Sequence, residues 1–171
     1  MTAYVALLRG VNLMGDTTLR MADLKAIAEK LGLDKVRTYI ASGNLLFESG
    51  KGEAAVKAAL EAAVERHMSR EVGVMVRTAK ELAGVVDANP FADEPGNTVV
   101  AIFFDAAPPP DAVEAATNVA DERLALGRRE IYVHYPSGQG RSKLNLRARA
   151  LGTARNMNTV AKLAELAREM S

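Results

Sequence analysis

The order of short apolar runs and amphipathic segments constrains the fold of this chain more than any other feature. An apolar run at Ala3–Leu8 is typical of a buried strand, and apolar residues then recur at helical spacing over residues 20–31. Two β-like stretches follow, Val36–Ile40 and Asn44–Glu48, and residues 41–43 join them as in a tight hairpin. The first half of the chain thus begins in the order β-α-β-β.

The first half ends with two further helical segments and one strand. Glu53–Met68 carries an apolar stripe at helical spacing, and Glu71–Arg77 alternates apolar and other residues as a half-buried strand does. Thr78 and Glu81 form a capping box ahead of another helix. The order β-α-β-β-α-β is that of a ferredoxin-like split βαβ unit, in which helices cover one face of an antiparallel sheet.

The second half begins in the same order after a boundary rich in Pro and acidic residues at Asp87–Asn97. We expect a strand at Thr98–Asp105, a helix near Ala112–Ala120, and strands at Arg123–Ala125 and Glu130–Tyr135. The C-terminus is predicted to be helical, with Asn158 as its cap and one apolar stripe formed by Val160, Leu163, Leu166, Ala167 and Met170.

These patterns predict an α+β fold of two ferredoxin-like lobes with antiparallel sheets and helices packed on them. The N-terminal lobe is expected at 1–88, a linker at 89–97, and the C-terminal lobe, with basic C-terminal helices, at 98–171. A sheet of parallel strands in doubly wound order would contradict this prediction.

The sequence contains five distinctive blocks: Tyr4–Asn12, Met21–Leu24, Val36–Asn44, Ser142–Leu144 and Thr153–Leu163. Together these blocks resemble the DUF1697 family. The resemblance implies a two-lobed α/β protein built from ferredoxin-like halves, and it carries no activity or catalytic residues over to this chain. Met157 departs from the family pattern, which usually has Trp there.

Composition excludes several classes of protein. The chain is 49% hydrophobic, which is enough to form a core, and its lack of Cys excludes disulfides and thiolate chemistry. The run Ala3–Leu8 is far shorter than the ~20 residues that cross a bilayer. No basic residue precedes the run, so we expect no signal peptide, no membrane partner and a cytoplasmic protein.

The distribution of charge prompts a search for an anionic partner. The chain has a net charge of +1, but residues 123–171 hold 10 Lys and Arg against 3 Asp and Glu, a balance of +7. A basic segment of this kind is typical of proteins that bind phosphate-bearing molecules or nucleic acid. The alternative is a solvated basic face with no ligand. The aromatic pattern of RNA-binding ferredoxin-like domains is absent, so base stacking has weak support.

The turn after the first strand is one candidate binding motif. Arg9 at the strand end offers a planar fork to a carboxylate or phosphate, and Gly10 and Asn12 form a turn that can expose backbone N–H groups. The alternative is local: Gly permits a positive φ, and Asn12 bonds its own backbone.

The hairpin at residues 39–44 is a second candidate. Ser42 lacks the frame of a nucleophilic serine, and the two His residues, His67 and His134, are poorly placed to serve as its base. We expect His67 near a helix end and His134 on the wetter face of a strand. Asn44 is better explained as a hairpin residue, with a role in ligand binding as the alternative.

The segment Ser137–Lys143 is the strongest candidate, because it combines two glycines, two hydroxyls and two cations. Such a loop before a helix can present N–H groups to an anion. On a helix, Lys143 and Arg147 would share one face. Arg155 and Asn156 follow further along the chain. The alternative is a flexible loop and a solvated basic helix.

No metal site or cofactor is expected, since two distant His and no Cys make a poor ligand set and no dinucleotide fingerprint occurs. The favoured function is binding of an anionic partner, possibly nucleic acid. The alternatives are an enzyme that acts on a phosphorylated small molecule through Arg9, Lys143 and Arg155, and a protein-interaction module. We expect one cleft between the lobes, lined by Arg9, Asn12, Ser42 and Asn44 from one lobe and by Ser142, Lys143, Arg155 and Asn156 from the other. Arg141 is a further candidate ligand-binding residue.

Overall fold

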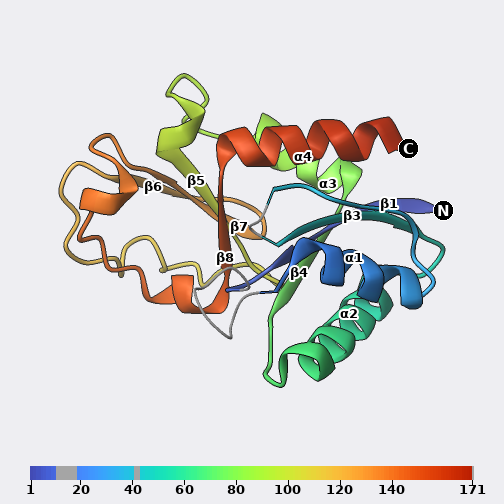
Figure 1. The fold of residues 1–171 in the computed structure, drawn as a ribbon. Helices are drawn as coiled ribbons and strands as arrows, with labels where there is room; N and C mark the ends of the chain where they lie inside the picture. The colour runs from blue at the N-terminus through green and yellow to red at the C-terminus, as the bar shows by residue number, and fades with distance from the viewer. Residues whose placement is uncertain (11–18, 41–42, 171) are drawn as a thin grey trace. The chain divides into compact units, whose positions relative to one another are not determined.

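The computed structural model describes residues 1–10, 19–40 and 43–170 (Figure 1). The chain divides into two compact units, and each is described by itself. One comprises Met1–Leu82 together with Leu163–Ser171, and the other comprises Ala83–Lys162. We call them the N-terminal unit and the C-terminal unit.

The N-terminal unit is built on a four-stranded antiparallel sheet with the order β2-β3-β1-β4. The apolar strand β1 is central, and its Val5 lies opposite Leu46 of β3 and Arg77 of β4. Every residue of β1 after the first is buried, which explains why the run in the sequence is continuous rather than alternating. The strands are β1 (Thr2–Leu8), β2 (Asp34–Thr38), β3 (Asn44–Ser49) and β4 (Val74–Thr78).

Two helices, α1 (Met21–Lys30) and α2 (Glu53–Met68), cover one face of this sheet (Figure 1). Leu24 of α1 and Leu60 of α2 are fully buried in one cluster with Phe47 of β3. Helical spacing places such side chains on the face toward the sheet, as predicted from the apolar stripes. Helix α1 ends before Gly32, whose φ of 82° suits Gly because it has no side chain.

The capping box predicted from the sequence is present at the start of α3 (Ala79–Asp87). The backbone N–H of Thr78 donates to Glu81 Oε1 at 2.9 Å, and the N–H of Glu81 donates to Thr78 Oγ1 at 3.1 Å. These reciprocal bonds satisfy two N–H groups at the helix start that have no intrahelical partner.

The C-terminal unit repeats the strand arrangement of the N-terminal unit. Its four-stranded antiparallel sheet has the order β6-β7-β5-β8. The central strand β5 places Ala101 opposite Tyr132 of β7 and Arg155 of β8. The strands are β5 (Val99–Phe103), β6 (Arg123–Leu126), β7 (Glu130–His134) and β8 (Thr153–Asn156).

The segments between the strands of the C-terminal unit differ from the prediction. The helix expected at Ala112–Ala120 is wrong: turns occupy residues 110–115, and Asn118 has a φ of 56°, which no α-helix accommodates. Irregular segments cover the sheet here. Ala112 and Leu146 from these segments are buried in one cluster with Ile102 of β5. Two short 3-10 helices, η3 (Gln139–Arg141) and η4 (Arg147–Leu151), lie between β7 and β8.

The C-terminal helix α4 (Met157–Met170) follows β8 directly. The cap predicted at Asn158 is wrong, since Asn156 Oδ1 accepts the backbone N–H of Thr159 at 3.0 Å and Asn158 lies inside the first turn. The last strand residue thus caps the helix, and a strand of only four residues had no apolar pattern to reveal it. The predicted stripe is buried at Val160, Leu163, Leu166 and Ala167.

These observations confirm the predicted α+β class with two ferredoxin-like sheets. In the described residues, four α-helices accompany the two antiparallel sheets. None of the helices in this part of the chain has the length and apolar character needed to cross a membrane.

Candidate functional site

A cavity in the C-terminal unit lies between two irregular segments, residues 118–122 and 137–143. Its volume is about 740 Å³, within the usual size of small-molecule sites. We call it the C-terminal pocket. It is lined by Asn118, Val119, Ala120, Asp121, Glu122, Ser137, Gly138, Arg141, Ser142 and Lys143.

A pair of backbone hydrogen bonds fixes the first wall of the pocket. The N–H of Thr117 donates to the carbonyl of Asn145 at 2.9 Å, and the N–H of Asn145 donates back to Thr117 at the same distance. The left-handed backbone at Asn118 then turns the chain, a conformation that Asn tolerates better than most residues. This isolated bridge positions residues 118–122 beside the loop at residues 137–143.

Two serine–carboxylate bonds hold the second wall against the first. Ser142 Oγ donates to Glu122 Oε2 at 2.6 Å, and Ser137 Oγ donates to Asp121 Oδ2 at 2.5 Å. Ser142 Oγ also accepts the N–H of Leu144 at 3.1 Å. The hydroxyls of the loop, which the sequence presented as possible ligand donors, are therefore engaged with carboxylates of the facing segment.

Glu122 is a fixed negative charge in the lining. Its side chain is buried, and the hydrogen bond from Ser142, followed by the N–H of Ala120 at 2.7 Å, lowers its pKa below the usual range of a glutamate. A carboxylate with a lowered pKa is a weak base. The contact between Ser142 and Glu122 therefore suits the holding of a loop better than activation of a nucleophile.

Arg141 and Lys143 supply the positive charge of the pocket. Both side chains are exposed, and in the described parts of the chain neither takes part in an ion pair. Their guanidinium and ammonium groups are available to an anion. Cations held on a loop that is itself anchored lose less entropy on binding than cations on free loops.

The backbone of this loop differs from the predicted cradle of N–H groups before a helix. The N–H groups of Gly138, Arg141 and Ser142 donate to carbonyls within or beside the loop. No α-helix starts at Lys143, so the expectation that Lys143 and Arg147 share a helical face is wrong. Side-chain charge, rather than a helix dipole, is what this loop offers to a ligand.

Arg155 and Asn156, the other predicted site residues of this unit, lie at β8. Arg155 is 8% exposed, and its Nη1 donates to Thr153 Oγ1 at 2.7 Å and to the Ala154 carbonyl at 2.9 Å. Burial lowers its pKa to about 10, which still leaves it charged at neutral pH. Asn156 caps α4. Neither residue lines the C-terminal pocket.

In the N-terminal unit, the predicted residues within the described ranges make local contacts. Arg9 is exposed at the end of β1, and its N–H donates to the Gly73 carbonyl at 2.9 Å. Asn44 is fully buried, and its Nδ2 donates to the Tyr39 carbonyl at 3.1 Å. Asn12 and Ser42 lie outside the described residues. The predicted cleft joins residues of both units and stays a prediction.

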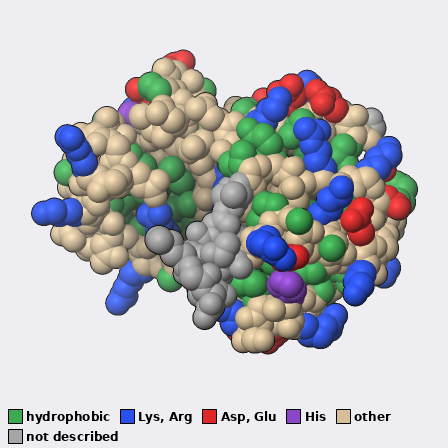
Figure 2. Space-filling model, in the orientation of Figure 1, with side chains coloured by type: hydrophobic (Ala, Val, Ile, Leu, Met, Phe, Trp, Pro, Cys, Tyr) green, Lys and Arg blue, Asp and Glu red, His purple; other side chains and the backbone are tan. Residues whose placement is uncertain are grey.

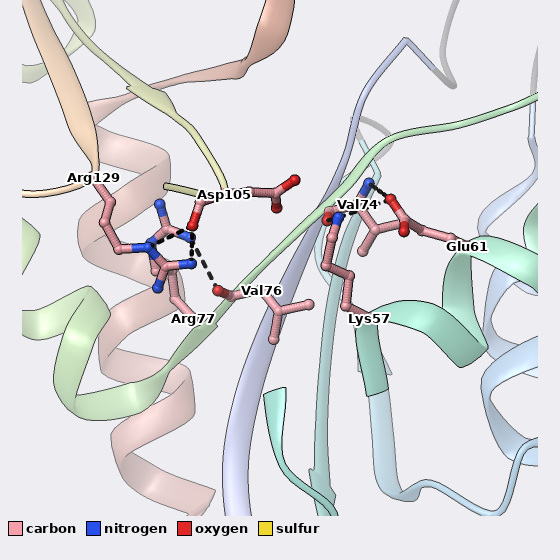
Figure 3. A network of polar contacts seen from close by, with 7 residues as sticks. All are labelled: Lys57, Glu61, Val74, Val76, Arg77, Asp105 and Arg129. Atoms are coloured by element: carbon pink, nitrogen blue, oxygen red, sulfur yellow. Dashed lines mark hydrogen bonds and ion pairs between the residues drawn. The ribbon is translucent and has the colours of Figure 1, made fainter. Parts of the chain in front are cut away.

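A second polar cluster in the N-terminal unit joins α2 to β4 (Figure 3). Lys57 Nζ donates to Glu61 Oε2 at 2.8 Å and to the Val74 carbonyl at 2.7 Å, and Glu61 accepts the Val74 N–H at 3.2 Å. A smaller cavity of about 280 Å³ lies beside Glu61, Glu65 and Glu71. Among residues 1–10, 19–40 and 43–170, no group of acidic, His or Cys side chains is arranged to hold a metal ion.

His134 corrects another expectation. The sequence placed it on the wetter face of its strand, but it is 4% exposed and its ring stacks on Phe91 with centroids 5.9 Å apart. Arg123 Nη2 lies 3.1 Å from His134 Nδ1 and 3.1 Å from Glu94 Oε1. Because an arginine only donates, Nδ1 is the acceptor, and His134 and Arg123 together bind the segment around Phe91 and Glu94 to the sheet.

The surface charge is dispersed on the face drawn in Figure 2. Lys and Arg side chains stand singly among polar and apolar ones, and acidic side chains occur among them. A continuous basic field, which tracks a nucleic-acid backbone, is not visible on that face.

Sequence reasoning found one wall of the C-terminal pocket and missed the other. The Gly, Ser and basic composition of residues 137–143 singled out that loop. Asp121 and Glu122 were missed because their partners, Ser137 and Ser142, are 16 and 20 residues away along the chain. A hint was available, since these two acids stand directly before the basic segment that begins at Arg123.

The chain matches a known protein family over most of its length. The family described as "Protein of unknown function (DUF1697)" matches residues 1–132. The chain belongs to the DUF1697 family. The match confirms the resemblance seen in the sequence blocks up to residue 44, whereas the loop at residues 137–143 lies beyond the matched residues.

A solved structure has the same fold as this DUF1697 protein. The chain is similar to a conserved bacterial protein, SP0830, from Streptococcus pneumoniae, with a TM-score of 0.83 and 24% sequence identity. The likeness covers 98% of this chain and 99% of that chain. At this identity the likeness establishes the fold alone. No curated protein shows a significant match.

Proposed function

We propose that this chain is a binding protein for a small phosphate-bearing or otherwise anionic molecule, which the C-terminal pocket takes up. The observation that carries the proposal is the pairing of exposed Arg141 and Lys143 on a loop anchored by the bond between Ser142 and Glu122. A guanidinium binds phosphate in a planar, two-point manner, and an ammonium adds a point charge beside it.

The size of the pocket supports a small molecule rather than a nucleic acid. A volume of about 740 Å³ holds a metabolite-sized ligand. A duplex or single strand needs cations spread along a groove, and the cations of the pocket come from one loop of seven residues. Binding of nucleic acid is therefore the alternative that the test below must distinguish from binding of a small molecule.

The chemistry of the lining supports binding rather than catalysis. The pocket residues include no His, and the carboxylate beside Ser142 has a lowered pKa. A general base with a pKa near the working pH is thus missing from this set of residues. The role of the pocket residues is to position and neutralise an anion.

Thermal unfolding with a panel of ligands tests the proposal. Inorganic phosphate, glucose 6-phosphate and AMP are added at increasing concentration, because a ligand that binds only the folded state raises Tm. At least one is expected to raise Tm in the wild type, and Arg141→Ala with Lys143→Ala to abolish the rise. Arg128→Ala removes one positive charge from an exposed turn outside the pocket and should retain the rise.

Two results would overturn the proposal. The first is a rise in Tm of equal size in the pocket variant and the wild type. The second is no response to any phosphate compound together with binding of a DNA or RNA oligonucleotide, with affinity falling by about 0.9 log unit per log unit of salt for each phosphate neutralised.

A further inference from the structure

The ionisable groups that line the C-terminal pocket sum to zero charge. Asp121 and Glu122 contribute two carboxylates, and Arg141 and Lys143 contribute two cations. A pocket built only for an anion gains nothing from carboxylates in its lining, because like charges repel across the low-dielectric space of a site. The two acids therefore need an explanation beyond the proposed function.

The hydrogen bonds that anchor the loop explain why Glu122 lies in the lining, but they explain the presence of Asp121 only in part. Both oxygens of Glu122 are engaged, Oε1 by the Ala120 N–H and Oε2 by Ser142 Oγ, and its side chain is buried. Asp121 is exposed, and among the residues that the structure describes its side chain accepts one hydrogen bond, from Ser137 to Oδ2. Its second oxygen is available to a cationic group in the pocket, since a carboxylate has about four acceptor positions.

The charges are separated by segment. The carboxylates come from residues 118–122 and the cations from residues 137–143, and the two serine–carboxylate bonds hold these segments together. A molecule lying across the pocket meets negative charge at one side and positive charge at the other. Val119, which is 48% exposed, adds an apolar surface to the first wall.

We infer that the ligand is dipolar, with an ammonium group beside Asp121 and a phosphate beside Arg141 and Lys143, as in an aminoalkyl phosphate. This inference rests on the proposed function and names its ligand class. An alkyl spacer between the two groups matches the apolar side chain of Val119. Charge complementarity of this kind selects against ligands that carry only one of the two groups.

Isothermal titration with a matched series of probes tests the inference. O-phosphoethanolamine carries both groups, ethyl phosphate lacks the amine and ethylamine lacks the phosphate. We expect O-phosphoethanolamine to bind about fivefold more tightly than ethyl phosphate, the gain of one partly exposed ion pair, and ethylamine to bind least. Asp121→Asn keeps an acceptor for Ser137 and should abolish the fivefold preference, while Asp111→Asn, on an exposed turn outside the pocket, should preserve it.

Each outcome separates the two proposals. If ethyl phosphate binds as tightly as O-phosphoethanolamine and loses affinity in Arg141→Ala, the proposed function holds and the dipolar ligand is wrong. If the preference for the amine survives in Asp121→Asn, the amine contacts another group and the assignment of Asp121 is wrong. If none of these probes binds while AMP or glucose 6-phosphate raises Tm, the dipolar ligand is wrong and the proposed function holds.

Discussion

The two units of this chain share a strand order but differ in what covers their sheets. In the N-terminal unit, α1 and α2 contribute Leu24, Val56 and Leu60 to one continuous core with the strands. In the C-terminal unit, turns and 3-10 helices cover the sheet instead, and Ala112 and Leu146 are among the residues buried against it. The same sheet thus supports a regular layer in one unit and irregular segments in the other.

The difference explains where a pocket can form. Close-packed helices leave little space over a sheet, whereas irregular segments leave gaps and expose side chains at fixed positions. The pocket of about 740 Å³ lies between two such segments, and its charged residues are held by hydrogen bonds to one another. The irregular segments over the sheet of the C-terminal unit thus leave room for a candidate binding site.

Core substitutions in the two units should change the free energy of unfolding most, and by different amounts. Leu60→Ala in α2 should lower the free energy of unfolding by about 3–4 kcal/mol, because a fully buried leucine leaves a cavity between rigid elements. Leu146→Ala should cost about 2 kcal/mol, since Leu146 is 7% exposed in an irregular segment that can relax. Urea denaturation followed by circular dichroism measures both. Equal losses would contradict the contrast between the two coverings.

The backbone at Gly152 passes close to Phe103 in the C-terminal unit, and a side chain there should lower the stability. A Cβ at Gly152 would lie 2.7 Å from the Phe103 carbonyl oxygen, so Gly152→Ala should cost about 2 kcal/mol through a backbone shift. Gly84→Ala is the matched control. A Cβ there meets no atom within 4 Å, and the change should stabilise α3 by about 0.5–1 kcal/mol. The same sign for both variants would refute this account of the packing.

Tyr132 gives a dependence on alkaline pH. Its hydroxyl donates to the Val85 carbonyl at 2.7 Å, and burial, with a smaller effect of Glu130, raises its pKa to about 12. An unfolded tyrosine ionises near pH 10, so its contribution is complete below pH 10 and is lost as the pH rises toward 12. Tyr132→Phe should cost about 1 kcal/mol at pH 8 and should flatten the fall in stability above pH 10. Parallel stability curves for the two proteins above pH 10 would show that Tyr132 does not titrate in this way.

The smallest effect distinguishes two asparagines at the start of α4. Asn156→Ala should lower the free energy of unfolding by about 1 kcal/mol, because it removes the acceptor for the Thr159 N–H. Asn158→Ala should change it less, since Asn158 is exposed within the first turn. Thermal unfolding of the two variants measures the difference. A larger loss of stability for Asn158→Ala would show that Asn158 is the cap, as predicted from the sequence.

Local patterns predicted the elements that local bonds hold. The helix at Glu53–Met68 and the capping box of Thr78 and Glu81 depend on residues three or four positions apart, and both appear as predicted. Strand β8 is different: its Thr153 and Arg155 are buried because β5 lies beside them, 50 and 54 residues away along the chain. Pairing over such distances leaves no periodic signal in four residues.

The candidate site follows the same rule. The composition of residues 137–143 pointed to a binding loop, and composition is a local property. The wall formed by Asp121 and Glu122 depends on the bridge between Thr117 and Asn145 and on serines far along the chain. These pairings belong to the folded structure and could not be derived from the sequence alone.

We propose that an anion binds between residues 118–122 and 137–143. Titration of the 15N-labelled protein with inorganic phosphate, followed by amide chemical shifts, tests it directly. We expect saturable shifts concentrated in these two segments, which disappear when Arg141 and Lys143 are replaced by alanine and persist in Arg128→Ala. Saturable shifts centred on Arg9 and Asn44 of the N-terminal unit, with the C-terminal pocket unaffected, would contradict it.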